Sequence, residues 1–345
     1  MPTVELPSAT PLTVGLVHRA RRTATALLDR SGVLQSQFRR HRDLRILCYH
    51  GVCADEVVDA PWVPSYFVGA SAFTRQLEIV RRFGPVIHLP DVAEQLARGA
   101  YQGPAAFAIT FDDVAACSFV HAQPALQKAG IRASFFVSTG HVTTGRLFAS
   151  DVLRVLNQDP DLIDPDDLDV LTWLVSRPHE HKHLPYEHLR APLERAAATL
   201  RERLDALRYE TLRPLNWNEI RALAEAGHEI GAHTVDHVSL GWQSDEIRCR
   251  QITDSVHQVE RELGRPVISF AYPHGGREHF GEQDFATLRS LGVRYAVTTR
   301  TSFTQRATPF AVPRVCIGRG HTDENFALEL SGLLDRRRQR QQRWR

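Results

Sequence analysis

The sequence predicts an α/β fold, a distorted (β/α) barrel of about seven parallel strands. Three observations lead to this prediction. Short apolar runs recur along the chain, helical patterns separate them, and polar motifs follow several of the runs. A chain of 345 residues, of which 43% are hydrophobic, is long enough to bury the core that such a barrel requires.

The predicted strands are the short apolar runs at residues 45–50, 85–89, 106–111, 132–137, 229–232, 267–271, 294–298 and 314–317. Amphipathic segments such as residues 73–83 and 217–226 lie between them, and Gly227 after the second segment is typical of a helix end. This alternation favours a mainly parallel sheet, and seven or eight such units favour a barrel.

Residues 141–215 interrupt the alternation. They contain a helical pattern at residues 148–156, an acid-rich run, the run HEHKH, and a long helical pattern over residues 189–207. We expect an insertion in one barrel loop that serves as a lid or a substrate wall. Its alternating histidines, which are His179, His181 and His183, are expected to be solvent-exposed rather than to form a second metal site.

The remaining boundaries follow from this organisation. Residues 1–42 are expected to form a helical arm, residues 43–322 the barrel, and residues 323–345 a C-terminal helix with an arginine-rich tail. Arginines crowd both ends of the chain. We expect solvated tails there, with contact to a membrane surface or an assembly partner as the alternative.

Composition excludes several classes of protein. The net charge of +2 gives no indication of a nucleic-acid partner. No apolar run is long enough to predict a transmembrane segment or a signal peptide, so a cytoplasmic location is expected. The five cysteines show no CxxC spacing, which argues against a disulfide framework or a zinc ribbon.

Two adjacent carboxylates, Asp112 and Asp113, follow an apolar strand. Residues just past the C-terminal end of a barrel strand face the mouth of the barrel. Adjacent carboxylates at such a place are costly unless a positive charge neutralises them. A plain turn is the alternative if this motif is taken alone.

The segment His233-Thr234-Val235-Asp236-His237 also follows a short strand. His-x3-His spacing places both imidazoles on one face if the segment is helical. Two histidines and one carboxylate are the ligands of a catalytic zinc site that keeps a position open for water. A third strand precedes Tyr272-Pro273-His274-Gly275-Gly276, a predicted tight turn whose backbone N–H groups can donate to an oxyanion.

These motifs together resemble the polysaccharide deacetylases, the NodB-like domain of carbohydrate esterase family 4. The resemblance covers roughly residues 44–320. It rests on TFDD at residues 110–113, HTVDH at residues 233–237 and FAYPHG at residues 270–275, supported by residues 47–52 and 215–239. The third motif is similar to that of a branch of the family with Ala-Tyr-Pro at this place.

The resemblance implies a hydrolase that removes N-acetyl groups from sugars in a polysaccharide or glycan precursor. It implies Asp113, His233 and His237 as ligands of one divalent metal, zinc in preference to cobalt or nickel, and Asp112 as the general base. A backbone N–H of the third motif, that of His274, would then stabilise the oxyanion, and Tyr272 and Pro273 would shape this part of the substrate site.

The chain departs from the family pattern in two places. Ala271 stands where many members carry an arginine that orients the catalytic aspartate, and Arg314 is the candidate substitute because a guanidinium can clamp a carboxylate. A surface arginine is the alternative interpretation. The general-acid histidine near the C-terminus is also missing, and His50 is the first candidate to replace it, ahead of His274 and His321.

Two other functions are open at this point. One is a C–N hydrolase on the same barrel that acts on a small amide or cyclic ureide instead of a sugar. The other is a non-catalytic glycan-binding or scaffold protein, for which the two departures from the family pattern are the support.

Overall fold

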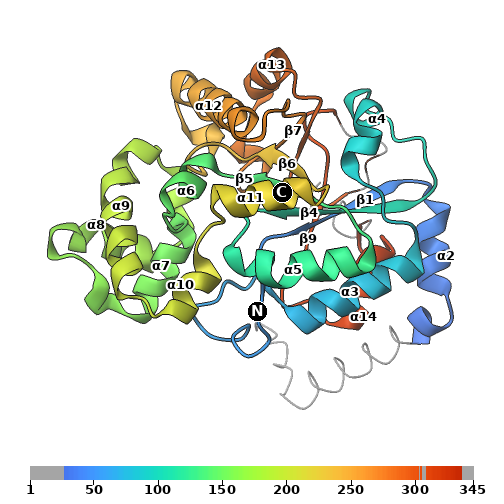
Figure 1. Cartoon of the computed structure of the whole chain (residues 1–345), viewed down its shortest axis with the longest axis horizontal. Coiled ribbons are helices and arrows are strands. Elements are labelled where there is room, and N and C mark those ends of the chain that lie inside the picture. The colour runs from blue at the N-terminus through green and yellow to red at the C-terminus, as the bar shows by residue number, and fades with distance from the viewer. Residues whose placement is uncertain (1–26, 303, 305–307, 336–345) are drawn as a thin grey trace, which may run out of the picture.

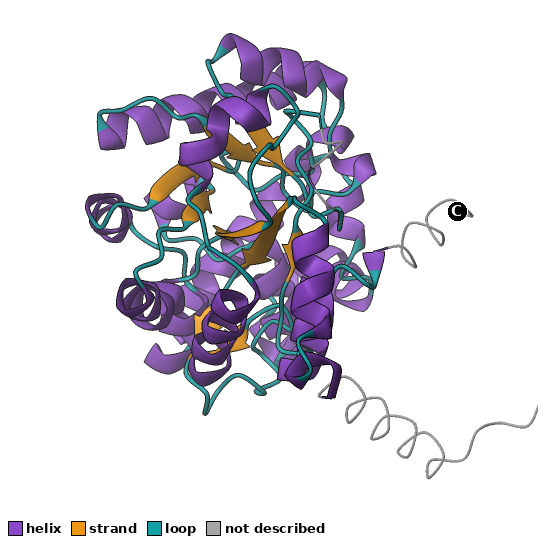
Figure 2. Ribbon diagram, turned by 90° about the vertical axis from the view of Figure 1, so that its right-hand side faces the viewer, coloured by secondary structure: helices purple, strands orange, loops and turns teal. Residues whose placement is uncertain are grey.

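The computed structural model describes residues 27–302, 304 and 308–335. Its centre is a curved sheet of seven parallel strands, in the order β8-β7-β6-β5-β4-β1-β9, with helices packed around it (Figures 1 and 2). This arrangement confirms the predicted α/β fold and its parallel, barrel-like sheet.

The strands are β1 (Leu44–Tyr49), β2 (Val52–Cys53), β3 (Val68–Gly69), β4 (Ala106–Asp112), β5 (Ser134–Val137), β6 (Glu229–Ala232), β7 (Ser269–Ala271), β8 (Tyr295–Val297) and β9 (Val315–Cys316). The α-helices are α2 (Val33–Arg40), α3 (Ala70–Phe83), α4 (Ala93–Ala97), α5 (Ala116–Ala129), α6 (Thr139–Thr144), α7 (Ala149–Gln158), α8 (Leu168–Ser176), α9 (Tyr186–Arg203), α10 (Ala206–Leu212), α11 (Trp217–Glu225), α12 (Asp245–Leu263), α13 (Glu282–Ser290) and α14 (Asp323–Leu330).

Strands β1 and β4 form the middle of the sheet. Every residue of both strands is buried, as expected for strands that helices cover on both faces. Their register pairs Leu44 with Ala106 and Tyr49 with Phe111, so both strands end at the same edge. The polar residues that follow them therefore meet there.

The barrel is incomplete, which is the main departure from the predicted strands. Residues 85–89 do not form a strand, because only Val86 pairs with β4, at Phe107, before Leu89–Val92 turns into a 3₁₀-helix with Pro90 in its first turn. Among the described residues, β8 and β9 are the two edges of the sheet. A second pair, β2 and β3, was not predicted.

Helices α7 to α10 lie within the predicted insertion and gather on the left of Figure 1, beside the sheet. They share an apolar core of their own with residues 53–67. The long helix predicted over residues 189–207 is two helices. Leu204 is extended, and the Asp205 carboxylate accepts a hydrogen bond from the Arg208 N–H to cap α10.

The two ends of the described chain pack on the same side of the barrel. Phe38 of α2 stacks on Phe107 of β4, with ring centroids 4.1 Å apart. Arg45 in β1 is fully buried and pairs with Asp335 at 2.7 Å and Glu329 at 3.1 Å, so this arginine is not part of a solvated tail. The predicted arm before residue 27 and the arginine-rich tail from residue 336 lie outside the described residues.

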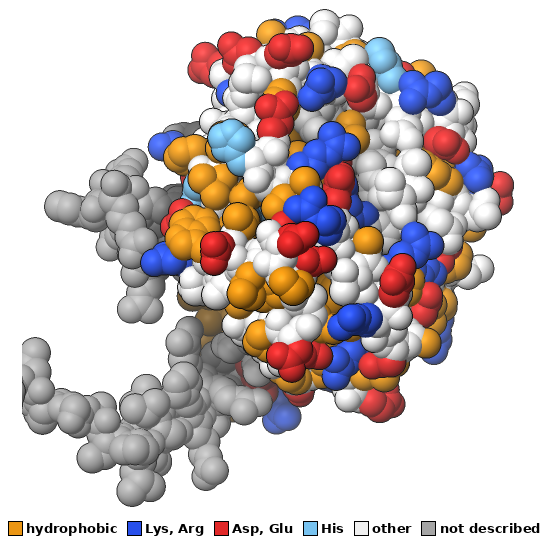
Figure 3. All heavy atoms as spheres, turned by 90° about the vertical axis from the view of Figure 1, so that its left-hand side faces the viewer, with side chains coloured by type: hydrophobic (Ala, Val, Ile, Leu, Met, Phe, Trp, Pro, Cys, Tyr) orange, Lys and Arg blue, Asp and Glu red, His pale blue; other side chains and the backbone are white. Residues whose placement is uncertain are grey.

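The surface on the insertion side carries basic and acidic side chains close to one another, with apolar side chains between them (Figure 3). Within the described part of the chain, no helix combines the length and the apolar character that crossing a membrane requires.

The apolar core of the insertion can be tested by one substitution. Leu200 of α9 is fully buried in this core, so we expect Leu200→Ala to lower the free energy of unfolding by about 2–5 kcal/mol. Leu207 of α10 is 57% exposed, and Leu207→Ala is expected to change the free energy of unfolding by less than about 0.5 kcal/mol. Urea unfolding of both variants is the measurement. Equal effects of the two substitutions would contradict a buried core here.

Candidate active site

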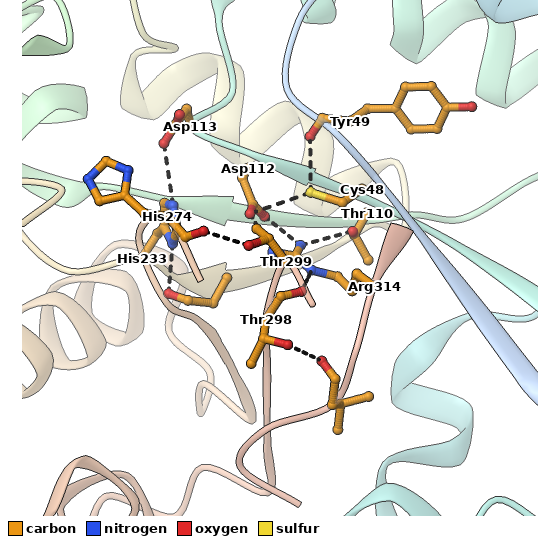
Figure 4. Close-up of polar contacts among 12 residues, drawn as sticks. Cys48, Tyr49, Thr110, Asp112, Asp113, His233, His274, Thr298, Thr299 and Arg314 are labelled. Atoms are coloured by element: carbon orange, nitrogen blue, oxygen red, sulfur yellow. Dashed lines mark hydrogen bonds and ion pairs between the residues drawn. The ribbon is translucent and has the colours of Figure 1, made fainter. Parts of the chain in front are cut away.

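Five of the predicted site residues meet at the C-terminal edge of the sheet and are labelled in Figure 4, namely Asp112, Asp113, His233, His274 and Arg314. Asp112 is the last residue of β4, and His233 directly follows β6. His274 lies three residues past the end of β7, and His50 directly follows β1. Because β7, β6, β5, β4 and β1 are successive neighbours in a parallel sheet, their ends bring these side chains together.

Asp113, His233 and His237 form the candidate metal centre. The Asp113 Oδ1 atom lies 3.4 Å from Nε2 of His233 and 3.0 Å from Nε2 of His237. This oxygen is buried, and neither contact satisfies hydrogen-bond geometry. An orphaned carboxylate oxygen that faces two imidazole nitrogens fits a divalent metal, which would satisfy all three atoms at once.

The orientation of His233 supports this assignment. Its Nδ1 lies 2.7 Å from the Ala271 carbonyl oxygen, which can only accept a hydrogen bond. Nδ1 therefore carries the proton and donates it, and Nε2 is directed to Asp113. A metal-binding histidine is commonly oriented in this way by an acceptor on its other nitrogen.

The charges of the site favour a cation. Burial alone would raise the pKa of Asp113, but His237 and His233 hold it well below its usual range. Burial alone would lower the pKa of His233, yet Asp113 and Asp112 raise it above its ordinary value. Both directions show that positive charge between these side chains is stabilised.

The local backbone of the site is left-handed at several non-glycine residues. These have positive φ values, which are 61° at Asp113, 43° at Val114, 64° at Thr234, 52° at His237 and 63° at His274. Such conformations are costly for residues with a Cβ and cluster at functional sites. Residues 233–237 are not helical but form a loop, and its left-handed residues direct both histidines to Asp113.

Arg314 and Asp112 form a buried ion pair beside the metal centre. The Arg314 Nη1 donates to Asp112 Oδ1 at 2.7 Å, and Nη2 donates to Oδ2. Thr110 Oγ1 and the Thr298 carbonyl oxygen accept further hydrogen bonds from this guanidinium at 3.0 Å each. Arg314 is completely buried, so the interpretation as a surface arginine is wrong.

This pairing sets the state of the Asp112 carboxyl. Burial alone would raise the pKa of Asp112, but Arg314 and His233 hold it below its ordinary value. Asp112 is therefore an ionised carboxylate in a fixed orientation.

Two residues around Asp112 were not predicted. Cys48 lies 3.5 Å from Asp112 through its sulfur atom, and Thr110 is bound to the Arg314 guanidinium. The signal for Thr110 was present in the sequence, because residues two apart on a strand share a face. Cys48 is paired in register with Thr110 across β1 and β4, which only the sheet pairing shows.

The three candidate acids lie in different surroundings. His50 has a buried Nδ1 without a hydrogen-bond partner, and one of its ring nitrogens lies within 4.8 Å of an Asp112 oxygen. The His274 ring packs against His237 with centroids 4.8 Å apart. His321 is engaged by its own turn, where its Nδ1 lies 3.2 Å from the Gly318 nitrogen.

The third motif contributes its backbone rather than its tyrosine. The Tyr272 ring is fully buried and stacks on Phe280 with centroids 4.2 Å apart, so it faces the core instead of a substrate. Pro273 shapes the turn, in which its carbonyl oxygen accepts from the Gly275 N–H at 2.7 Å. No described residue accepts a hydrogen bond from the His274 N–H, which leaves that donor available to an oxyanion.

The insertion reaches the mouth of the site. The His181 ring lies 6.0 Å from the His274 ring, and His183 lies 5.8 Å from His279, measured between centroids. Both insertion histidines are half-buried, so the expectation that they are solvent-exposed is wrong for them and holds for His179 alone. His181, His237 and His274 line a pocket of about 30 Å³ between the insertion and the barrel.

A paired carboxylate and two imidazoles at the open edge of a parallel barrel fit the site of a metal-dependent hydrolase. The comparison with protein families agrees. The family model described as polysaccharide deacetylase matches residues 100–296, more than half of the chain. The chain belongs to the polysaccharide deacetylase family, whose members are metal-dependent hydrolases that release N-acetyl groups from sugars by cleaving a C–N bond that is not a peptide bond.

Solved structures show the same fold. The Streptococcus pyogenes deacetylase PplD, in complex with acetate, superposes with a TM-score of 0.56 at 17% identity, over 84% of this chain and 98% of its own. IcaB from Ammonifex degensii superposes with a TM-score of 0.53 at 20% identity, over 84% of this chain and 96% of its own. A de-N-acetylase from Aggregatibacter actinomycetemcomitans superposes with a TM-score of 0.54 at 12% identity, over 83% of this chain and 99% of its own. No curated protein sequence matches the chain.

The buried ion pair predicts a large and specific stability effect. Arg314→Ala leaves the Asp112 carboxylate buried without its partner, so we expect a loss of about 3–5 kcal/mol in the free energy of unfolding of the chelator-treated protein. The double variant Arg314→Ala/Asp112→Asn is expected to recover much of the lost free energy of unfolding, because it no longer buries an uncompensated charge.

Arg75→Ala is the matched control for this comparison of the single and double variants. Arg75 pairs with Asp323 at an exposed place, and its loss is expected to cost less than about 1 kcal/mol. Urea unfolding measures all of these variants. If the double variant were as unstable as the sum of the two single variants, the two residues would not be coupled.

Proposed function

We propose that this chain uses one divalent metal, zinc in preference to cobalt or nickel, to deacetylate N-acetylglucosamine units in a polysaccharide or glycan precursor. Asp113, His233 and His237 would hold the metal. The observation that carries the proposal is the orphaned Asp113 oxygen facing two imidazole nitrogens, beside a carboxylate that Arg314 keeps ionised.

When bound, such a metal polarises the amide carbonyl and lowers the pKa of water towards about 7. Asp112 accepts the proton of the attacking water, because its carboxylate is ionised and fixed by Arg314. The free N–H of His274 donates to the oxyanion that develops on the acetyl group. Arg314 touches only Asp112 and its neighbours, so it is a positioning residue.

His50 is the proposed donor to the leaving amine. Burial lowers the pKa of His50, so the ring is neutral before the reaction. The proton that it delivers is then the one that Asp112 takes from water, since the two groups are within 4.8 Å and one water can bridge that gap. One proton of the water thus reaches the leaving amine through Asp112 and His50. The other proton stays on the hydroxyl group of the acid product and passes to the free amine when acetate forms.

The choice of substrate follows from the family and its relatives. One structural relative is described as a de-N-acetylase and another was solved with acetate bound. An N-acetylated hexosamine is the sugar that offers an acetamide to such a site. Oligomers of N-acetylglucosamine are therefore the first substrate to test.

The division of roles between the two aspartates can be tested directly. Asp112→Asn is expected to keep the metal content of the wild type and to lower kcat by at least about 10²-fold, because only the proton acceptor is removed. Asp113→Asn is expected to lower metal affinity as well, because a ligand oxygen is lost. Metal content by elemental analysis and acetate release are the measurements.

The control is Asp91→Asn, an exposed residue paired with Arg132, which is expected to alter neither quantity. Full activity of Asp112→Asn would remove this residue from the role of base. Unchanged metal content in both Asp113→Asn and His237→Ala would overturn the proposed metal centre.

The proposed acid is tested by His50→Gln. This substitution is expected to lower kcat by about 10²-fold with little change in KM or metal content, because it removes proton delivery and not binding. His321→Gln is the matched control and is expected to keep kcat. The opposite pattern, in which His321→Gln loses activity and His50→Gln does not, would assign the acid to His321.

A further inference from the structure

The insertion touches the barrel through the segment around its short 3₁₀-helix, Glu180–His183. The Gln243 side chain secures this contact, because its Oε1 accepts from the Tyr186 N–H at 3.0 Å and its Nε2 donates to the Leu184 carbonyl oxygen at 3.4 Å. The segment is thereby placed over the loops that follow β6 and β7. His183 faces one of them.

Three potential ligands meet at this contact. His183 comes from the insertion, and Glu278 and His279 come from the loop after β7. One ligand atom of each lies within 4.8 Å of those of the other two. The His279 Nε2 atom is 3.3 Å from Glu278 Oε1, and the rings of His183 and His279 are nearly parallel, 6° apart.

The surroundings of His279 resemble those of a metal ligand. Ser239 Oγ lies 2.7 Å from His279 Nδ1, so this side chain fixes the ring through its other nitrogen. His279 is buried and His183 is half-buried, which partly removes the site from water.

The cluster is separate from the candidate active site. The His274 ring stands between them, with its centroid 4.8 Å from that of His237 and 5.0 Å from that of His279. None of the three ligands belongs to the set of Asp113, His233 and His237. Two imidazoles and one carboxylate suit zinc and neighbouring transition metals better than magnesium or calcium.

We propose that His183, Glu278 and His279 bind a second divalent transition metal, which joins the insertion to the loop after β7. A bond from His183 on one side and from Glu278 and His279 on the other would hold the insertion over the mouth of the active site. This proposal does not depend on the catalytic activity. A direct contact between His279 and Glu278, with the His183 ring packed at a tilt against Trp242, is the competing arrangement.

Zinc stoichiometry of the full chain tests the proposal. The protein is stripped with a chelator, dialysed against zinc and analysed for metal content. We expect two zinc ions per chain in the wild type, and one in His183→Ala and in Glu278→Gln. The matched control His179→Ala, an exposed histidine of the same segment, is expected to keep two.

A double variant separates the two metal sites. His233→Ala/His237→Ala is expected to keep one zinc, which His183→Ala then removes. A wild type with one zinc that this double variant loses would overturn the second site and leave the proposed function standing. Two zinc ions retained in His183→Ala would also overturn it.

Discussion

The buried pair of Arg314 and Asp112 is the interaction on which the rest of the site depends. A carboxylate at the centre of a parallel sheet is tolerated only with a partner, and the guanidinium supplies two hydrogen bonds to it while using others to hold Thr110 and the Thr298 carbonyl. The pair links Asp112 at the end of β4 to Arg314 just before β9, although the two residues are 202 positions apart in the sequence. It therefore holds these two segments together and fixes the orientation of the Asp112 carboxylate.

The remaining active-site groups are placed by strand ends. Neighbouring parallel strands deliver Asp113, His233 and His274 to one edge, and left-handed residues turn each side chain or N–H group inward. Such strained residues persist because the surrounding sheet and loops determine their conformation. These strained conformations thus bring the Asp113 carboxylate and the two imidazoles together, which makes a metal site between them possible.

The insertion adds a layer that the barrel itself does not have. Its helices have their own apolar core, and a polar segment of it leans over the loops after β6 and β7. His181 and His183 consequently face His274 and His279 instead of solvent. The region of the chain with the least regular pattern therefore lies next to the site and lines the pocket beside it.

The sequence by itself determined the fold class, because strand and helix patterns have distinct periods, and it determined the aspartates and histidines, because they follow predicted strands in ordered motifs. The sequence named Arg314 as a candidate partner of Asp112, and only the tertiary structure decided that it is this partner and not a surface arginine, since sheet order brings the two residues together. It also decided that Tyr272 faces the core and that His183 meets His279. Contacts between distant segments depend on how the whole chain packs, so local sequence patterns do not predict them.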